Sequence, residues 1–233
     1  MNSLVKNIRI VAIGLVLAVI SALAFPRTLQ AQWRVGVNAG ASYNKYAIDK
    51  QYMTDYRFNG AWGVTMGVTA QYSFLDWLGV RGSLNLSQRN YRHTRAVLAD
   101  RLNCLYENDY LLLPMTANFS FGGNALRGFL NLGVYGGYWL NSHRSGREYS
   151  SFSNWPYDFS EQVQFNAEKD QRCDFGYTGG VGMEWQFSRH WAVQAEALCY
   201  YSIVSSVKQY MTQVKDYRYN TTLGLQAGVM YLF

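Results

Sequence analysis

Apolar and polar residues alternate with a period of two at the end of the chain. In residues 217–233 one set of alternate positions is aromatic at both ends and aliphatic in the middle, and the other set is mostly small or polar. Successive side chains of a β-strand point to opposite faces, so this pattern predicts a strand with one apolar face. Aromatic residues at both ends of the apolar face are typical of a transmembrane barrel strand, which faces lipid on one side and a polar lumen on the other.

The same alternation recurs along the chain after its first thirty or so residues. The predicted strands are residues 33–46, 62–74, 78–91, 109–121, 128–140, 172–187, 191–204 and 217–233. One residue conflicts with its strand: Pro114 cannot donate a ladder hydrogen bond, and it therefore predicts a bulge or a local break in pairing.

The connections between these strands alternate between long and short. Residues 47–60, 92–108, 141–171 and 205–216 form long polar loops, and residues 75–77, 122–124 and 188–190 form turns of hairpin length. Outer-membrane barrels have short periplasmic turns and longer external loops. The sequence therefore predicts an all-β, eight-stranded, antiparallel, up-and-down transmembrane barrel with both termini in the periplasm.

The amino-terminus reads as a targeting segment. Lys6 and Arg9 precede an apolar run over residues 10–25, and Leu29-Gln30-Ala31 is a plausible cleavage site. Ala22-Leu23-Ala24 competes as the cleavage site, and an uncleaved anchor helix is the alternative. We expect a signal peptide over residues 1–31 and one barrel domain over residues 32–233.

Composition and charge narrow the class of protein. The mean hydropathy of −0.17 is low for a helical membrane protein, whereas a barrel turns half of each strand to a polar lumen. The formal charge is +6, and Lys6, Arg9 and Arg27 of the leader account for half of it. The remaining basic residues form no patch, so we expect no nucleic-acid partner.

Charged residues on the inward faces give the first candidate site. Arg34, Arg81, Glu184 and Glu196 all lie within a few residues of the predicted periplasmic ends. Charges in a narrow, poorly hydrated lumen must pair. These four residues therefore predict an ion-pair layer that plugs the barrel, with a catalytic carboxylate or a gate as alternatives.

The cysteines leave two readings open. Cys104 and Cys173 fall in predicted outer loops or at their edges, and an exported chain meets oxidising surroundings. They form either a disulfide or two free thiols. Cys199 falls on a lipid-facing position and reads as a small apolar residue.

An enzyme would need a base beside a carboxylate. His93 and His143 fall near the outer ends of their strands with Asp174 in the same region, and His190 falls in a short turn. This set is weak, and surface-loop histidines are usually solvated. No phosphate loop, dinucleotide fingerprint or paired-cysteine metal motif is present, so we expect no cofactor and no metal.

Several segments resemble one family. The segments RVGVNAGAS (34–42), YLLLPM (110–115), FLNLGVYGGY (129–138) and YTGGVGME (177–184) are similar to strands of the PorT-like outer-membrane barrels of Bacteroidota. The resemblance implies an eight-stranded outer-membrane barrel, and some members of that family serve the type IX secretion system. It carries over no catalytic residue.

Three functional hypotheses follow. The first is a non-enzymatic accessory or anchor subunit of an envelope machine such as type IX secretion, with outer-membrane lipid and other envelope proteins as its partners. The second is a small pore or solute-binding barrel. The third is an outer-membrane hydrolase.

Overall fold

The computed structural model describes residues 32–50, 56–95, 102–123, 125–149, 155–208 and 216–233. Within these ranges no helix has the length and apolarity needed to cross a membrane. The predicted signal peptide, residues 1–31, lies outside the described residues. The strands are β1 (Gln32–Lys50), β2 (Tyr56–Ser73), β3 (Leu78–Gln88), β4 (Tyr91–Arg95), β5 (Leu102–Gly122), β6 (Leu126–Tyr149), β7 (Pro156–Gln162), β8 (Cys173–Gln186), β9 (Trp191–Ser202) and β10 (Asp216–Leu232).

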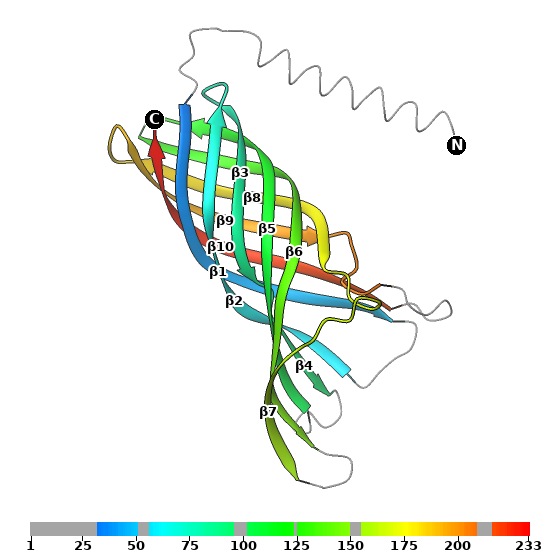
Figure 1. Ribbon diagram of the computed structural model, residues 1–233. Coiled ribbons are helices and arrows are strands. Elements are labelled where there is room, and N and C mark those ends of the chain that lie inside the picture. Colours follow the sequence, from blue (N-terminus) through cyan, green and yellow to red (C-terminus); the bar gives the residue numbers. More distant parts are fainter. Residues whose placement is uncertain (1–31, 51–55, 96–101, 124, 150–154, 209–215) are drawn as a thin grey trace, which may run out of the picture. The chain divides into compact units, whose positions relative to one another are not determined.

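Eight of the strands close into a ring of antiparallel neighbours (Figure 1). The ring runs β1–β2–β3–β5–β6–β8–β9–β10, and β10 pairs with β1 to close it. Strand β4 continues the course of β3 after a break at Arg89 and Asn90, and β7 pairs with β6 alone among the described strands. The predicted eight-stranded up-and-down barrel is confirmed, and closure leaves no strand edge exposed to lipid.

The register fixes the tilt of the strands. Following paired residues once around the ring from Arg34 leads back to β1 at Asn44, ten positions further along. The path passes through Gln71, Arg81, Thr116, Gly133, Thr178, Tyr200 and Thr222. A stagger of this size tilts the strands of an eight-stranded barrel by roughly 40° and leaves an interior that side chains can fill.

The two faces of each strand differ as the alternation predicts. On β1, Val37 is 59% exposed and faces outward, whereas its neighbour Asn38 is 4% exposed and faces the lumen. The inward set is mainly Asn, Gln, Ser, Thr and Arg, and the outward set is aliphatic and aromatic. The core of this molecule is therefore polar, and its apolar surface is the outside.

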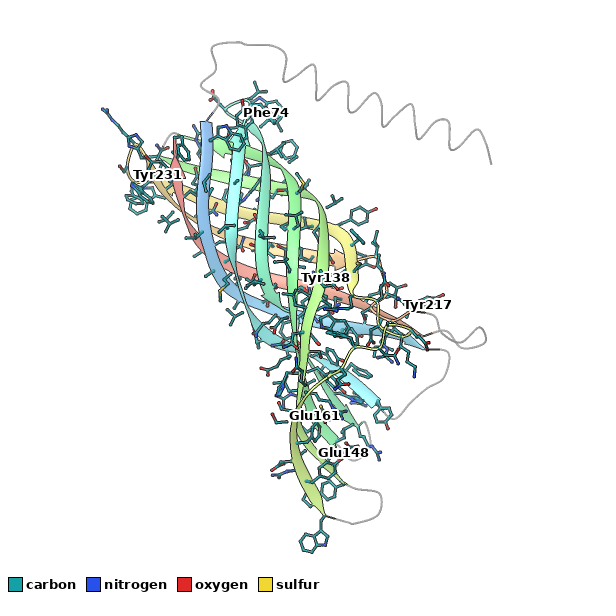
Figure 2. The ribbon with its side chains drawn as sticks, in the orientation of Figure 1. Phe74, Tyr138, Glu148, Glu161, Tyr217 and Tyr231 are labelled. Atoms are coloured by element: carbon teal, nitrogen blue, oxygen red, sulfur yellow. The ribbon has the colours of Figure 1, made fainter. Side chains whose placement is uncertain are left out.

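Two belts of aromatic side chains bound the apolar surface. Figure 2 shows Phe74 and Tyr231 at the end of the barrel where β1 begins and β10 ends, which we call the termini end, and Tyr138 and Tyr217 toward the opposite or far end. On β1 the belts are marked by Trp33 and Tyr43. Ten residue steps at about 3.3 Å, tilted by about 40°, span about 25 Å, which is the height of an outer-membrane apolar band.

At the far end several strands continue past the aromatic belt of that end, and the predicted loops 47–60, 92–108 and 141–171 are partly wrong for this reason. Strand β1 runs to Lys50, β5 begins at Leu102 and β6 continues to Tyr149. The first part of β2, with β4, β7 and these ends of β5 and β6, forms a sheet that we call the strand extension (Figure 1). On β7 and at the end of β6 most residues of both faces are at least partly exposed, so these segments lose the apolar alternation that marks the lipid-facing part.

Pro114 interrupts one ladder as predicted. Pairing between β3 and β5 reaches Gly82 and Met115 and resumes only at Asn85 and Leu112. On its other side Pro114 stays in register opposite Tyr135 of β6. The break is confined to one neighbour because proline lacks only the N–H group.

Candidate functional site

The lumen contains an ion pair close to the termini end. Arg34 on β1 donates from Nη1 to Glu184 Oε1 on β8 at 2.5 Å, and their side chains are 5% and 7% exposed. The two strands are not neighbours in the ring, so the pair crosses the interior and ties opposite walls together.

A second pair lies further along the lumen. Arg81 Nη1 on β3 is 3.5 Å from Glu196 Oε2 on β9, and both side chains are buried. Glu196 also accepts hydrogen bonds from Asn131 at 2.6 Å and Gln226 at 2.9 Å. The carboxylate is thereby held by three different strands, as a buried charge must be.

Side-chain amides extend this second pair into a chain of hydrogen bonds. Asn131 accepts from Asn118 at 2.7 Å, and Asn118 accepts from Gln71 at 3.0 Å and from Ser120 at 2.8 Å. The chain crosses β2, β5, β6 and β9, so the inward amides join the walls of the barrel as well as filling it.

A third ion pair closes the far end of the lumen, and sequence analysis did not pair its members. Arg89, which is fully buried, forms an ion pair with Asp174, and Asp174 also accepts from the hydroxyls of Tyr135 and Ser202. The guanidinium carbon of Arg89 lies 5.0 to 5.7 Å from the centres of three tyrosine rings, those of Tyr110, Tyr135 and Tyr200. The three rings stabilise the cation where water cannot reach it.

The space left between these groups is very small. A cavity of about 20 Å³ lies between Arg81, Asn85, Tyr200 and Glu196, among other lining residues. This volume is enough for about one water molecule. Both terminal nitrogens of Arg81 and the side-chain oxygen of Asn85 are buried without a hydrogen-bond partner, so they suit such a water. At this level of the lumen the side chains therefore leave room for about one water molecule.

Stacked aromatic rings continue from the mouth of the lumen into the strand extension. Tyr91 stacks on Tyr46 at 4.3 Å and on Tyr106 at 4.8 Å, and Phe58 stacks on His93 at 4.5 Å. The stack joins β1, β2, β4 and β5, and Tyr46 and Tyr91 are buried in it. It fastens the base of the extension to the barrel.

Comparison with known proteins identifies the family. The family model described as "Outer membrane protein beta-barrel domain" matches residues 27–206. The chain belongs to this family. It is an outer-membrane β-barrel protein of the bacterial outer membrane.

The chain is similar to several solved structures, of which the first has a TM-score above 0.5. The outer membrane protein OprG from Pseudomonas aeruginosa is 11% identical over 87% of this chain and 96% of its own, with a TM-score of 0.55. Neisserial surface protein A has 14% identity, coverage of 87% and 97% and a TM-score of 0.43. The outer membrane protease OmpT from Escherichia coli has 9% identity, coverage of 91% and 100% and a TM-score of 0.39. No protein of curated function matches the chain.

The structure contradicts the predicted disulfide between Cys104 and Cys173. Cys104 and Cys173 are both free thiols, the first buried and the second exposed. The two cysteines lie on the two neighbours of β6. Cys104 of β5 is opposite Gly146 of β6, and Cys173 of β8 is opposite Tyr138 of β6. These two positions are eight residues apart, or about 26 Å along a strand, whereas a disulfide requires Cα atoms within about 7 Å.

The residues proposed for a hydrolase are not assembled in the barrel. His143 contacts Ser160 of β7 at 2.9 Å, His93 stacks on Phe58 across β4 and β2, and Asp174 is held inside the lumen by Arg89. The described residues also contain no group of three or more His, Cys, Asp and Glu side chains placed to hold a metal ion.

Ion pairs on the strand extension are exposed, in contrast to those of the lumen. Arg147 makes two hydrogen bonds to Asp158, at 2.7 and 3.0 Å, and Arg144 forms an ion pair with Glu161. The hydrogen bond from Arg147 lowers the pKa of the Asp158 carboxyl below its usual value. Both pairs tie β7 to β6, and neither was predicted, because the predicted loop 141–171 assigned no partner strand to either side.

Proposed function

We propose that this chain is a non-conducting outer-membrane barrel that acts as an accessory or anchor subunit of an envelope machine. The observation that carries the proposal is the closed lumen: three buried ion pairs and a water-sized cavity occupy the place where a pore would run. A barrel that transports nothing through its interior is free to serve as a fixed support for other proteins.

The strand extension supports the same proposal. It carries exposed polar and aromatic side chains well past the aromatic belt, as a surface for another protein would. We propose that the extension points out of the cell, that both termini of the barrel face the periplasm and that residues 1–31 are a cleaved signal peptide. The resemblance of four strands to PorT-like barrels of Bacteroidota makes type IX protein secretion the machine to test first.

Conductance decides between an anchor and a pore. Purified protein in planar lipid bilayers is expected to give no steady channel currents under an applied voltage. Stable open channels would overturn the proposal and favour the small-pore hypothesis.

The secretion assignment needs a separate test. A strain that lacks the gene is expected to lose secretion of type IX cargo, and chemical crosslinking in native membranes is expected to join the barrel to subunits of the machine. Normal secretion together with an absence of crosslinked partners would remove this assignment.

A further inference from the structure

Strand β7 is the outermost strand of the strand extension. It pairs with β6 over all 7 of its residues, from Pro156 to Gln162. No other strand in the described part of the chain pairs with its second edge. In Figure 1, β7 lies beside β6 at the far tip of the molecule.

The hydrogen-bonding pattern shows which backbone groups this second edge presents. Just after β7, the N–H of Val163 donates to the carbonyl of Ser142 on β6 at 2.9 Å. In an antiparallel ladder the residues that bond to a given neighbour alternate. The backbone N–H and C=O groups therefore point toward β6 at residues 157, 159, 161 and 163. Those of Asp158, Ser160 and Gln162 point away from it.

Free strand edges in natural proteins are usually protected by charged side chains, by proline, by bulges or by covering segments. Pro156 removes the N–H group at the first outward position of β7, and positions 158, 160 and 162 keep theirs. The two acids of β7 do not protect this edge, because Arg147 and Arg144 of the same sheet neutralise them. The nearby aromatic side chains are exposed: Trp155 by 78% and Tyr157 by 48%. The edge thus offers backbone hydrogen bonds and aromatic surface without a net charge that would repel another strand.

We propose that the second edge of β7 binds an extended segment of another protein by strand addition, with the backbone groups of Asp158, Ser160 and Gln162 as its hydrogen-bonding partners. The inference rests on the proposed anchor function and names the element through which the anchor would hold its partner.

A second copy of this chain does not fit the edge as an antiparallel partner. Strand β7 runs along β6, which itself crosses the membrane as part of the barrel. An antiparallel pair of β7 strands would relate two copies by a two-fold axis lying in the membrane plane. The second barrel would then point away from the membrane that holds the first, which excludes this antiparallel self-pairing, and the proposed occupant is a segment of a different protein.

The side chains of β7 specify the kind of segment. Tyr157 and Phe159 lie on one face with their ring centres 6.1 Å apart, and Arg144 lies over Phe159. Asp158 and Ser160 lie on the other face. Cross-strand pairs favour aromatic or β-branched residues opposite the first face and hydroxyl residues opposite the second. The ligand class is an extended peptide that alternates apolar and hydroxyl side chains.

The test uses two variants of one residue in the full-length protein. Ser160→Pro removes an N–H that points away from β6, and proline is tolerated at such edge positions. Ser160→Ala keeps that N–H and, like the proline variant, loses the contact between the Ser160 hydroxyl and His143. The two variants therefore differ in the backbone donor, and the heat-modified gel mobility of the barrel verifies that both are folded.

The probe is a capped peptide of alternating valine and threonine with lysine at each end, of the same 7-residue length as β7. For the parent and Ser160→Ala, saturating peptide is expected to slow exchange of the outward amides of residues 158, 160 and 162 by about tenfold or more. For Ser160→Pro the slowing at residues 158 and 162 is expected to be lost. Absence of slowing in the parent, or equal slowing in the proline variant, would overturn the inference.

The experiments distinguish failure of strand addition at β7 from failure of the anchor function. If the barrel is silent in bilayers and crosslinks to an envelope protein equally well with Ser160→Pro, the anchor stands and its partner binds elsewhere. If the barrel conducts, the anchor fails whatever the peptide does.

Discussion

At the scale of single residues, the lumen depends on charges that are buried and matched. Arg34 and Glu184 illustrate this, because each is almost fully shielded from water and the two form an ion pair across the barrel. Removal of one member of a buried ion pair strongly destabilises the folded state, whereas replacement of both members by apolar residues often changes the stability little. The stability of the barrel should therefore respond very differently to one substitution and to two.

We predict that Glu184→Leu lowers the free energy of unfolding by about 3–5 kcal/mol, because it leaves the Arg34 guanidinium uncompensated in the lumen. The double variant Arg34→Met with Glu184→Leu is expected to recover most of that loss. Urea unfolding in detergent micelles, followed by tryptophan fluorescence, measures both. Equal stability of the single variant and the parent would show that Arg34 and Glu184 do not form a buried ion pair.

Cys104 gives a prediction about pH. Burial raises the pKa of its thiol to about 11. The reactive species is the thiolate, so this thiol stays protonated and unreactive at neutral pH and gains reactivity only as the pH approaches 11. The raised pKa also means that the folded state favours the neutral thiol, so this contribution to stability is present below the unfolded pKa and is lost as the pH rises through about 11.

At pH 8 we expect a water-soluble disulfide reagent to modify the exposed Cys173 rapidly and Cys104 slowly. In a variant with both Cys173→Ser and Cys199→Ser, which keeps Cys104 as its one cysteine, the fast phase should disappear, and raising the pH should accelerate the slow reaction of Cys104. A fast phase that survives in this variant would contradict the burial of Cys104. As a control, reduction of the untreated protein should not increase its number of free thiols, because the cysteines form no disulfide.

At the scale of elements, the strand extension depends on the aromatic stack at its base. Tyr91 lies between Tyr46 and Tyr106, so removal of its ring ends the side-chain packing of β4 against β1 and β5. Truncation of a buried aromatic residue to alanine typically costs about 3–5 kcal/mol. The eight-stranded ring is closed on the termini side of Tyr91, so the lost stability should affect the strand extension and not the barrel.

We predict that Tyr91→Ala makes the extension sensitive to protease at concentrations that leave the parent intact, while the barrel keeps its heat-modifiable mobility on gels. Tyr91→Phe retains the stacked ring and should behave as the parent does. Mass spectrometry of the first cleavage products locates the cuts. Initial cleavage inside residues 62–74 would instead mean that the stack holds the barrel itself together.

The elements differ in how far the sequence reveals them. The lipid-facing part of each strand was predictable, because Val35, Val37 and their equivalents alternate with small polar residues and lipid enforces that contrast. Residues 141–149 read as a loop, because both faces of this part of β6 are polar: His143, Ser145 and Arg147 on one face and Arg144 and Glu148 on the other. A strand that meets water on both sides has no hydropathy signal to detect.

The candidate site shows the same division. The inward direction of Arg34, Arg81, Glu184 and Glu196 follows from alternation alone. The pairing of acids with bases depends on the stagger of the closed sheet. The sequence of a single strand does not reveal that stagger. For that reason the pairing of Arg89 with Asp174 across the lumen was not predicted.

At the scale of the whole molecule, closure of the lumen follows from two features together. The eight strands and their stagger fix the width of the interior, and the side chains fill that width. Removal of side chains should therefore open a path without changing the barrel. Both members of a pair must be removed at once, since a lone buried charge would destabilise the fold.

We predict that a variant with Arg81→Ala, Glu196→Ala, Arg89→Ala and Asp174→Ala folds and gives small, steady channel currents in planar bilayers, whereas the parent gives none. The substitutions empty the middle and far end of the lumen, where the cavity now has a volume of about 20 Å³. A variant with the same number of substitutions on the lipid face, Val35→Ala, Val37→Ala, Val64→Ala and Val68→Ala, controls for loss of bulk and should stay silent. If the lumen variant is folded and equally silent, the ion pairs are not what closes the barrel, and closure belongs to the tyrosine rings around Arg89.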